Sequence, residues 1–311
     1  MPPLTLAQPL TLRMCLQMTR PNFIVITEVA CLLGIATSMA CGHPLQVGKA
    51  IATLALAALL HAAANVLNDY HDARNGADAA NHEGLFPFTG GARFIQNGQV
   101  TVAQTGQLAW ALMIVLVPSG MLLAVQSGGG LIVLGLVGLL AAWAYSAPPL
   151  ALMTRGLGEL TVGLTWLCVV VGADYVQRGQ FFFMPWVVGL SFALLVANVL
   201  LINGFPDAKA DASVGKCTAV VRLGPVGASM VYGAVACLAY AWVVVGTWLF
   251  LHPEPALWGL VSIPLSLIAL VLLFKYAQQP ARLKSAIVLT IAATVLHGLA
   301  TLVGLLSLQL A

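Results

Sequence analysis

The sequence has very little charge. Only 7% of its 311 residues are Asp, Glu, Lys or Arg, whereas a soluble globular chain has roughly 25%. Its hydrophobic share is 60% and its mean hydropathy is +0.96. A chain of this composition cannot cover a water-facing surface with polar side chains, which excludes a soluble globular protein.

Cysteine and histidine are also sparse and unpatterned. The six cysteines form no CxxC pair, and most lie in apolar stretches, where Cys behaves as a small apolar residue. The sequence therefore predicts no metal site of Cys or His ligands. Alternation of apolar and polar residues with period two is absent too, which argues against a membrane β-barrel.

Long apolar runs recur over most of the chain. A membrane-spanning helix needs about 20 mostly apolar residues, and only helices and closed barrels satisfy their backbone in lipid. We therefore expect an all-α, polytopic helical bundle in a single intramembrane domain of residues 1–311, embedded in a lipid bilayer. About nine spans are predicted, at residues 22–42, 48–67, 104–126, 129–146, 157–177, 181–203, 225–250, 255–276 and 284–308.

The basic residues are distributed asymmetrically between the loops. With the N-terminus inside, the cytoplasmic segments hold every Lys and Arg except Lys49 and Arg178, which is eleven of the 13. This split follows the positive-inside rule. We therefore expect a multi-pass protein of a bacterial inner membrane, with the N-terminus cytoplasmic. The small net charge of +3 gives no reason to expect a nucleic-acid partner.

The few acidic residues are concentrated in two predicted cytoplasmic loops, residues 68–101 and 204–224. These two loops hold six of the ten Asp and Glu residues. In each, an Asn precedes an Asp by four residues, and a second Asp follows three or four residues later. The clusters lie four predicted helices apart, which indicates two pseudo-repeats of four helices with both clusters at one membrane face.

The spacing within each cluster places its polar residues on one helical face. In the first cluster these residues are Asn65, Asp69 and Asp72, and in the second they are Asn203, Asp207 and Asp211. Carboxylates that converge at one site repel each other and need cations. Mg²⁺ suits such a site because it binds through one or two carboxylates together with substrate phosphates, and nearby Arg and Lys suit the same anion. The pattern predicts a diphosphate site.

Four segments resemble the signatures of the UbiA superfamily of intramembrane prenyltransferases. Residues 65–78 resemble the first Asp-rich motif of that family, and residues 203–224 resemble the second. Arg20-Pro21 and the stretch from Tyr145 to Glu159 also fit. Within the family the chain is most like the 1,4-dihydroxy-2-naphthoate polyprenyltransferases of menaquinone synthesis.

The resemblance implies Mg²⁺-dependent transfer of a prenyl chain from a polyprenyl diphosphate to an aromatic acceptor, best assigned as 1,4-dihydroxy-2-naphthoate. The residues expected to be catalytic are Asp69, Asp72, Asp207 and Asp211, and these same four with Asp78 are expected to hold metal. The residues expected to bind substrate are Asn65, Asn68, Tyr70, Arg74, Arg93, Tyr145, Asn203, Lys216 and Arg222.

Several alternatives remain open from the sequence. Residues 86–95 and Phe205-Pro206 depart from the family pattern, so the acceptor could be another quinone or pigment precursor. A transporter with a cytoplasm-facing acidic site is the leading non-enzyme alternative. CDP-alcohol phosphotransferases also use Asp clusters at the membrane face, but their expected motif is absent. His61, one helical turn before Asn65, is a further candidate for the site.

Overall fold

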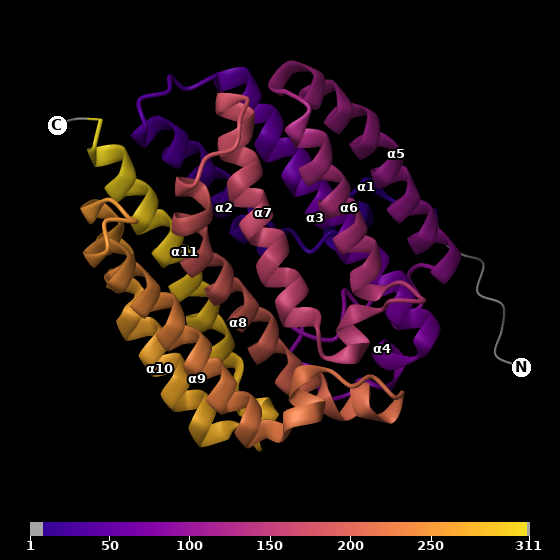
Figure 1. The fold of residues 1–311 in the computed structure, drawn as a ribbon. Helices are drawn as coiled ribbons and strands as arrows, with labels where there is room; N and C mark the ends of the chain where they lie inside the picture. The colour runs from indigo at the N-terminus through magenta and orange to yellow at the C-terminus, as the bar shows by residue number, and fades with distance from the viewer. Residues whose placement is uncertain (1–8, 310–311) are drawn as a thin grey trace, which may run out of the picture.

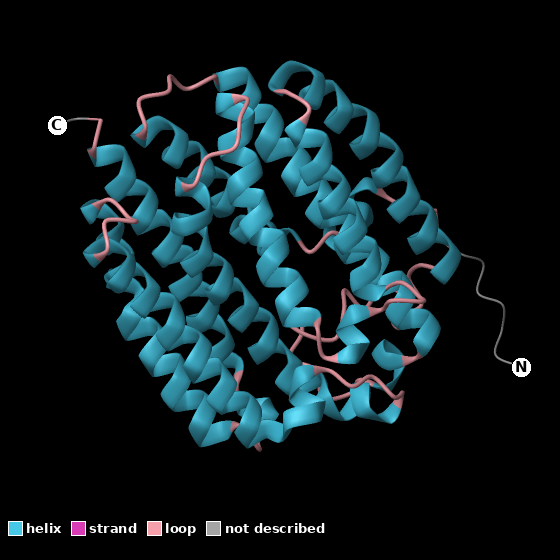
Figure 2. Ribbon diagram, viewed as in Figure 1, coloured by secondary structure: helices cyan, strands magenta, loops and turns pink. Residues whose placement is uncertain are grey.

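The computed structural model describes residues 9–309, and every regular element in this part of the chain is a helix (Figures 1 and 2). The all-α prediction is therefore confirmed. The α-helices are α1 Leu12–Met18, α2 Pro21–Ala40, α3 Val47–Asn75, α4 Ala77–Ala80, α5 Val102–Ser127, α6 Gly130–Ser146, α7 Gly158–Arg178, α8 Met184–Ser213, α9 Ala219–Trp248, α10 Ile263–Tyr276 and α11 Lys284–Ser307, with short 3₁₀ turns η1 Leu152–Arg155, η2 Glu254–Ser262 and η3 Pro280–Arg282.

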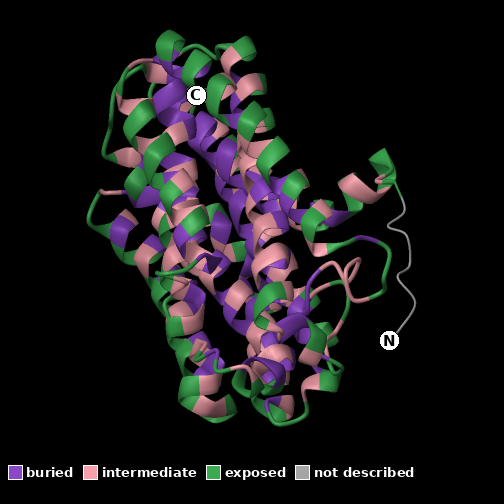
Figure 3. Ribbon diagram, turned by 90° about the vertical axis from the view of Figure 1, so that its right-hand side faces the viewer, coloured by how far each residue is buried: buried purple, intermediate pink, exposed green. Residues whose placement is uncertain are grey.

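Within residues 9–309, nine apolar helices match the nine predicted spans. Eight are long and apolar enough to cross a membrane, with η2 and α10 together forming one of them, and α6 is a shorter apolar helix of 17 residues. A helix of 17 residues is at the lower end of the range that spans a hydrocarbon core. Many large apolar side chains on the long helices are exposed, as contact with lipid requires. Figure 3 marks the exposed residues along the bundle. The chain is an integral, multi-pass membrane protein.

The two predicted acidic loops begin later than expected. α3 continues to Asn75, where Gly76 ends it in the left-handed conformation that glycine adopts without strain. α8 continues through Pro206 to Ser213. The predicted loop starts at residues 68 and 204 were wrong because buried packing, including Phe205 and Ala210, keeps a polar or Pro-containing stretch helical.

α3 and α8 bring the two acidic clusters to the same end of the bundle, next to α4 (Figure 1). α8 is the central helix: 72% of its apolar window is buried, against 22% for the peripheral α5. Its buried Phe192 packs with Leu33 of α2 and Val170 of α7 in the main core. We call the end that holds the two clusters the carboxylate end. The four-helix pseudo-repeat agrees with the similar lengths of α3 and α8 and otherwise stays a prediction.

Candidate active site

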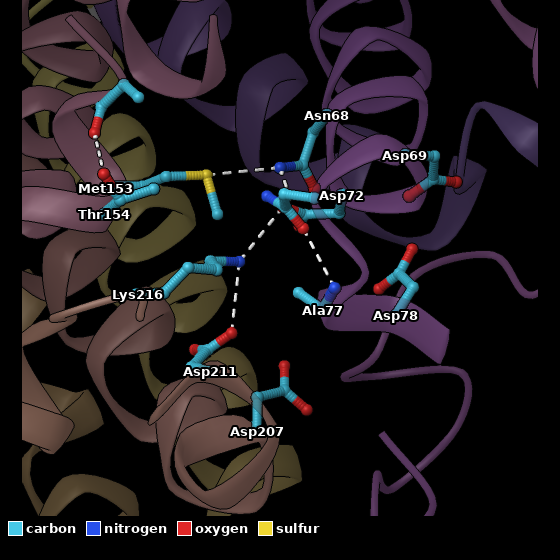
Figure 4. Close-up of polar contacts among 12 residues, drawn as sticks. Asn68, Asp69, Asp72, Ala77, Asp78, Met153, Thr154, Asp207, Asp211 and Lys216 are labelled. Carbon is cyan, nitrogen blue, oxygen red and sulfur yellow. Dashed lines mark hydrogen bonds and ion pairs between the residues drawn. The ribbon is translucent and has the colours of Figure 1, made fainter. Parts of the chain in front are cut away.

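The five predicted Asp side chains lie at the neighbouring ends of α3, α4 and α8 (Figure 4). The predicted helical spacing holds within both long helices: Asp69 and Asp72, an i, i+3 pair, lie on the last turns of α3, and Asp207 and Asp211, an i, i+4 pair, lie on the last turns of α8. Asp78 comes from α4, directly after the Gly76 turn. Helix continuation therefore aims both clusters inward instead of leaving them in solvated loops.

Lys216 joins the two clusters. Its Nζ lies 3.1 Å from Asp72 Oδ1 and 3.1 Å from Asp211 Oδ1, and only 5% of the residue is exposed. Burial lowers the pKa of Lys216, but Asp72 and Asp211 outweigh it, so the pKa is raised overall. A single buried ammonium group therefore forms ion pairs with one carboxylate from each helix and compensates one of their two charges.

Arg20 supplies the positive charge at Asp69, as Lys216 does at Asp72 and Asp211. Its guanidinium forms an ion pair with Asp69 Oδ1, and the amide of Ala92 donates to Asp69 Oδ2 at 3.2 Å. Arg20 immediately precedes α2 and has a positive φ of 52°, a conformation that is uncommon for a residue other than Gly. The Arg20-Pro21 dipeptide thus places a cation on the first cluster just before the first span begins.

The segment between α4 and α5 covers the site. The amide of Asn81 donates to Asp207 Oδ1 at 2.6 Å, and the Gly90 N–H donates to Asp207 Oδ2 at 3.1 Å. Gly91 has a φ of +78°, and a Cβ there would lie 2.7 Å from Asp78 Oδ2. Only glycine allows this backbone to approach the Asp78 carboxylate so closely.

Asp78 shows how strongly the site favours added positive charge. Its burial and the nearby Asp72 and Asp69 raise its pKa to about 8. A carboxyl group with such a pKa is protonated at neutral pH unless a cation stabilises its charge.

These side chains surround a carboxylate pocket of about 130 Å³. Five acidic residues line it, whereas Asp69 does not line it and is paired with Arg20. With Asp69 included, six acids stand against two basic residues, which leaves four negative charges uncompensated when all are ionised. The charged lining residues are Asp72, Asp78, Glu159, Asp207, Asp211, Arg20 and Lys216.

The donor set fits Mg²⁺ bound together with a substrate phosphate. Within residues 9–309 no three His, Cys, Asp or Glu side chains are grouped closely enough to hold a metal ion by themselves. Mg²⁺ commonly takes only one or two protein carboxylates and completes its octahedron with water and phosphate oxygens. The carboxylates on opposite walls of the pocket match that requirement, and a diphosphate would supply the missing ligands.

A second hollow, the polar cavity of about 190 Å³, continues from the pocket into the bundle. The two share six lining residues, and three of the predicted substrate-binding residues, Asn68, Tyr145 and Asn203, are among them. Asn65 lines the polar cavity but not the carboxylate pocket, and its side-chain amide donates to the Thr19 carbonyl at 2.9 Å. Asn68 donates to Asp72 Oδ2 at 3.2 Å, so it also orients a carboxylate.

A third hollow, the apolar cavity of about 370 Å³, lies farther from the carboxylate end between α3, α5, α6 and α7. It shares five lining residues with the polar cavity, so the three hollows follow one another through the bundle. The shared residues are Ala57, Leu60, Gly138, Thr165 and Val169.

Four predicted substrate-binding residues do not line any of these hollows. Tyr70 and Arg74 contact each other, with Arg74 donating to the Tyr70 hydroxyl at 3.0 Å, and the Tyr70 ring faces Gly106 of α5. Arg93 donates to backbone carbonyls of Asp78 and Asn81, and Arg222 donates to the Cys217 carbonyl at 3.0 Å. Tyr70 and Arg74 lie on a face of α3 that points away from the hollows. The side chains of Arg93 and Arg222 are held by backbone carbonyls.

The site also contains residues that the sequence did not assign. Arg20 had a signal, because it stands alone before the first apolar run. Asn81 and Gly90 had none, because they reach Asp207 from an irregular segment more than 100 residues away in sequence.

Comparison with known proteins finds a matching family. The model of the UbiA prenyltransferase family matches residues 29–293. A 1,4-dihydroxy-2-naphthoate octaprenyltransferase of Mycobacterium tuberculosis is 32% identical over 224 residues, which are 70% of this chain and 72% of that protein. The protein of the same name from Escherichia coli is 29% identical over 261 residues, which are 78% and 82% of the two chains.

Solved structures share the fold. The apo structure of a UbiA homologue from Aeropyrum pernix superposes with a TM-score of 0.63 at 19% identity, covering 91% of this chain and 98% of that one. A UbiA homologue from Archaeoglobus fulgidus, bound to GPP and Mg²⁺, has a TM-score of 0.57 at 14% identity, covering 93% and 99%. The chain belongs to the UbiA prenyltransferase family, and it is a membrane-embedded prenyltransferase.

Proposed function

We propose that this enzyme transfers a prenyl chain from a polyprenyl diphosphate to 1,4-dihydroxy-2-naphthoate, with Mg²⁺ as cofactor, in menaquinone synthesis. The observation that carries the proposal is the carboxylate pocket, in which acids from α3, α4 and α8 face one another across Lys216 and open onto a cavity inside the bundle. The names of the curated relatives support the choice of acceptor.

Asp69, Asp72, Asp78, Asp207 and Asp211 would hold the metal with the diphosphate, and Mg²⁺ would neutralise the charge that develops on the leaving group. Lys216 and Arg20 already stand among these carboxylates and can donate to the same phosphate oxygens. Arg suits a diphosphate through paired hydrogen bonds, and Lys acts as a compact point charge.

The reaction breaks the bond between the allylic carbon and its oxygen, and the bonding electron pair leaves with the diphosphate. A ring carbon of the acceptor attacks the resulting allylic cation. The ring becomes aromatic again when that carbon loses a proton, or CO₂ if it carries the carboxylate, and the bonding electron pair returns to the ring. The bundle contributes by keeping water from the cation, because most residues that line the polar and apolar cavities are hydrocarbon. The pocket would face the cytoplasm, as the distribution of Lys and Arg predicts.

The direct test supplies the purified, membrane-embedded protein with labelled polyprenyl diphosphate and a panel of aromatic acceptors, with and without Mg²⁺. We expect label to move to 1,4-dihydroxy-2-naphthoate only when Mg²⁺ is present. Transfer to a different quinone precursor would correct the acceptor, and absence of transfer to every acceptor would contradict the proposal.

A further inference from the structure

His61 lies in the polar cavity, on α3, one helical turn further from the carboxylate end than Asn65. Thr27 of α2 fixes one side of its ring, because Thr27 Oγ1 and His61 Nδ1 are 2.7 Å apart. Trp166 of α7 fixes another, since the two rings meet edge to face with centroids 5.1 Å apart. Three helices thus hold one imidazole in a single orientation.

The arrangement leaves polar groups without partners. Among the described residues His61 Nε2 has no hydrogen-bond partner. Trp166 Nε1 and Asn203 Oδ1, which belong to other residues lining the same cavity, are buried without partners in the described part of the chain. A buried polar group without a partner is costly. A cavity lined by two such buried atoms, and by the unpartnered His61 Nε2 beside them, is therefore shaped for a ligand with polar atoms of its own.

A prenyl chain cannot satisfy these groups, because it is pure hydrocarbon. The apolar cavity suits the chain better: its two hydroxyl groups, on Thr53 and Thr165, already bond to carbonyls of their own helices at 2.8 Å and 2.7 Å. The two cavities therefore differ in chemistry, and among the described residues only the polar cavity offers free side-chain nitrogen or oxygen atoms. Its ligand should be flat, apolar over most of its surface and polar at one edge.

We propose that His61 binds a ring hydroxyl of the aromatic acceptor through Nε2, with Thr27 and Trp166 as the residues that position the imidazole. This inference rests on the proposed function. It assigns the acceptor to the polar cavity, the diphosphate to the carboxylate pocket and the hydrocarbon tail to the apolar cavity. His61 thereby becomes a determinant of acceptor specificity that does not touch the diphosphate.

The test uses variants that separate the two ring nitrogens. In His61→Gln the amide lies near the position of Nε2, whereas in His61→Asn it lies near Nδ1 and cannot reach the acceptor. Thr27→Val removes only the hydroxyl that holds Nδ1. His43→Gln, at the opposite end of the bundle beside Phe182, is the matched control.

Steady-state kinetics of the full chain in lipid nanodiscs give the KM for 1,4-dihydroxy-2-naphthoate and for polyprenyl diphosphate separately. We expect His61→Asn to raise the acceptor KM about tenfold while the prenyl diphosphate KM stays within about twofold. His61→Gln should retain most of the wild-type acceptor KM, Thr27→Val should raise it by a smaller factor, and the control should leave both constants unchanged.

Acceptor analogues that lack the 1- or the 4-hydroxyl complete a double-mutant cycle. The wild-type enzyme should lose about the same factor for one analogue as His61→Asn loses for the full acceptor, and the variant should lose nothing more for that analogue. An unchanged acceptor KM in His61→Asn, an equal rise in both KM values, or additive losses in the cycle would overturn the inference. If the wild-type chain transferred no prenyl group to any hydroxynaphthoate, the proposed function would fail, and this inference with it.

Discussion

Replacing Lys216 by Met removes the only ammonium group that lies between Asp72 and Asp211 among the described residues. Met has a similar volume, so the variant tests charge more than packing. Breaking a buried ion pair by removing one partner costs about 3–5 kcal/mol, because the other charge stays buried without compensation. Two carboxylates lose their partner here, so we expect a loss of at least about 3 kcal/mol in the free energy of unfolding.

Lys209→Met is the matched control, because it removes a lysine from an exposed pair. Lys209 Nζ lies 2.6 Å from Glu83 Oε1, at the same end of the molecule, and both side chains are largely exposed. Exposed pairs contribute about 0–1 kcal/mol. The stability of both variants and of the wild type is measured by unfolding in detergent, first with EDTA and then with Mg²⁺.

Comparing unfolding in EDTA with unfolding in Mg²⁺ shows whether the pocket binds a cation or is held together by packing alone. A ligand that binds only the folded state stabilises it, and Mg²⁺ can replace the missing ammonium group in Lys216→Met. We therefore expect Mg²⁺ to stabilise Lys216→Met more than it stabilises the wild type or Lys209→Met. Equal losses in the two variants, or no effect of Mg²⁺ on Lys216→Met, would refute this account of the pocket.

Three further predictions concern the cofactor, the covering segment and the apolar cavity. Chelation of divalent metal should abolish prenyl transfer, and added Mg²⁺ should restore it, because carboxylates and a diphosphate cannot share the pocket without cations; transfer that persists in EDTA would contradict this. Gly91→Ala should lower kcat at least about tenfold because its Cβ would displace Asp78, whereas Gly98→Ala, which has a similar positive φ but open space around it, should have little effect; equal rates in the two variants would argue against the displacement. Gly135→Leu should shorten the longest prenyl chain that is accepted, because Gly135 lines the apolar cavity and has no neighbour within 4 Å of its Cβ position; an unchanged chain-length profile would place the tail elsewhere.

The sequence predicted the bundle and the acidic residues because both follow from local patterns. Apolar runs of about 20 residues define the spans, and the spacing from Asn65 to Asp72 holds in any α-helix. The same local patterns predicted loop starts at residues 68 and 204, which is too early. Polar residues such as Asp72, and Pro206, are typical of loops when their tertiary contacts are unknown. Lys216 and the tertiary packing around α8 keep those stretches ordered and helical.

Contacts between distant segments could not be predicted in this way. Tyr70 belongs to the first motif, yet its helical phase turns it toward α5. Asp207 takes hydrogen bonds from a segment far away in sequence, and His61 depends on Thr27 and Trp166 from two other helices. A single sequence shows which residues share a helix face, but it does not show which faces meet.

The central claim is that carboxylates of α3 and α8 act together on one diphosphate. The most direct measurement compares prenyl transfer by Asp72→Asn, Asp207→Asn and Glu83→Gln in the presence of Mg²⁺, with folding checked by unfolding in detergent. Glu83 is the matched acidic control, because it lies at the same end but is exposed and paired with Lys209. We predict that both Asp variants remain folded and lose at least about 100-fold in transfer rate, whereas Glu83→Gln retains it. Near wild-type transfer by either Asp variant would contradict the account.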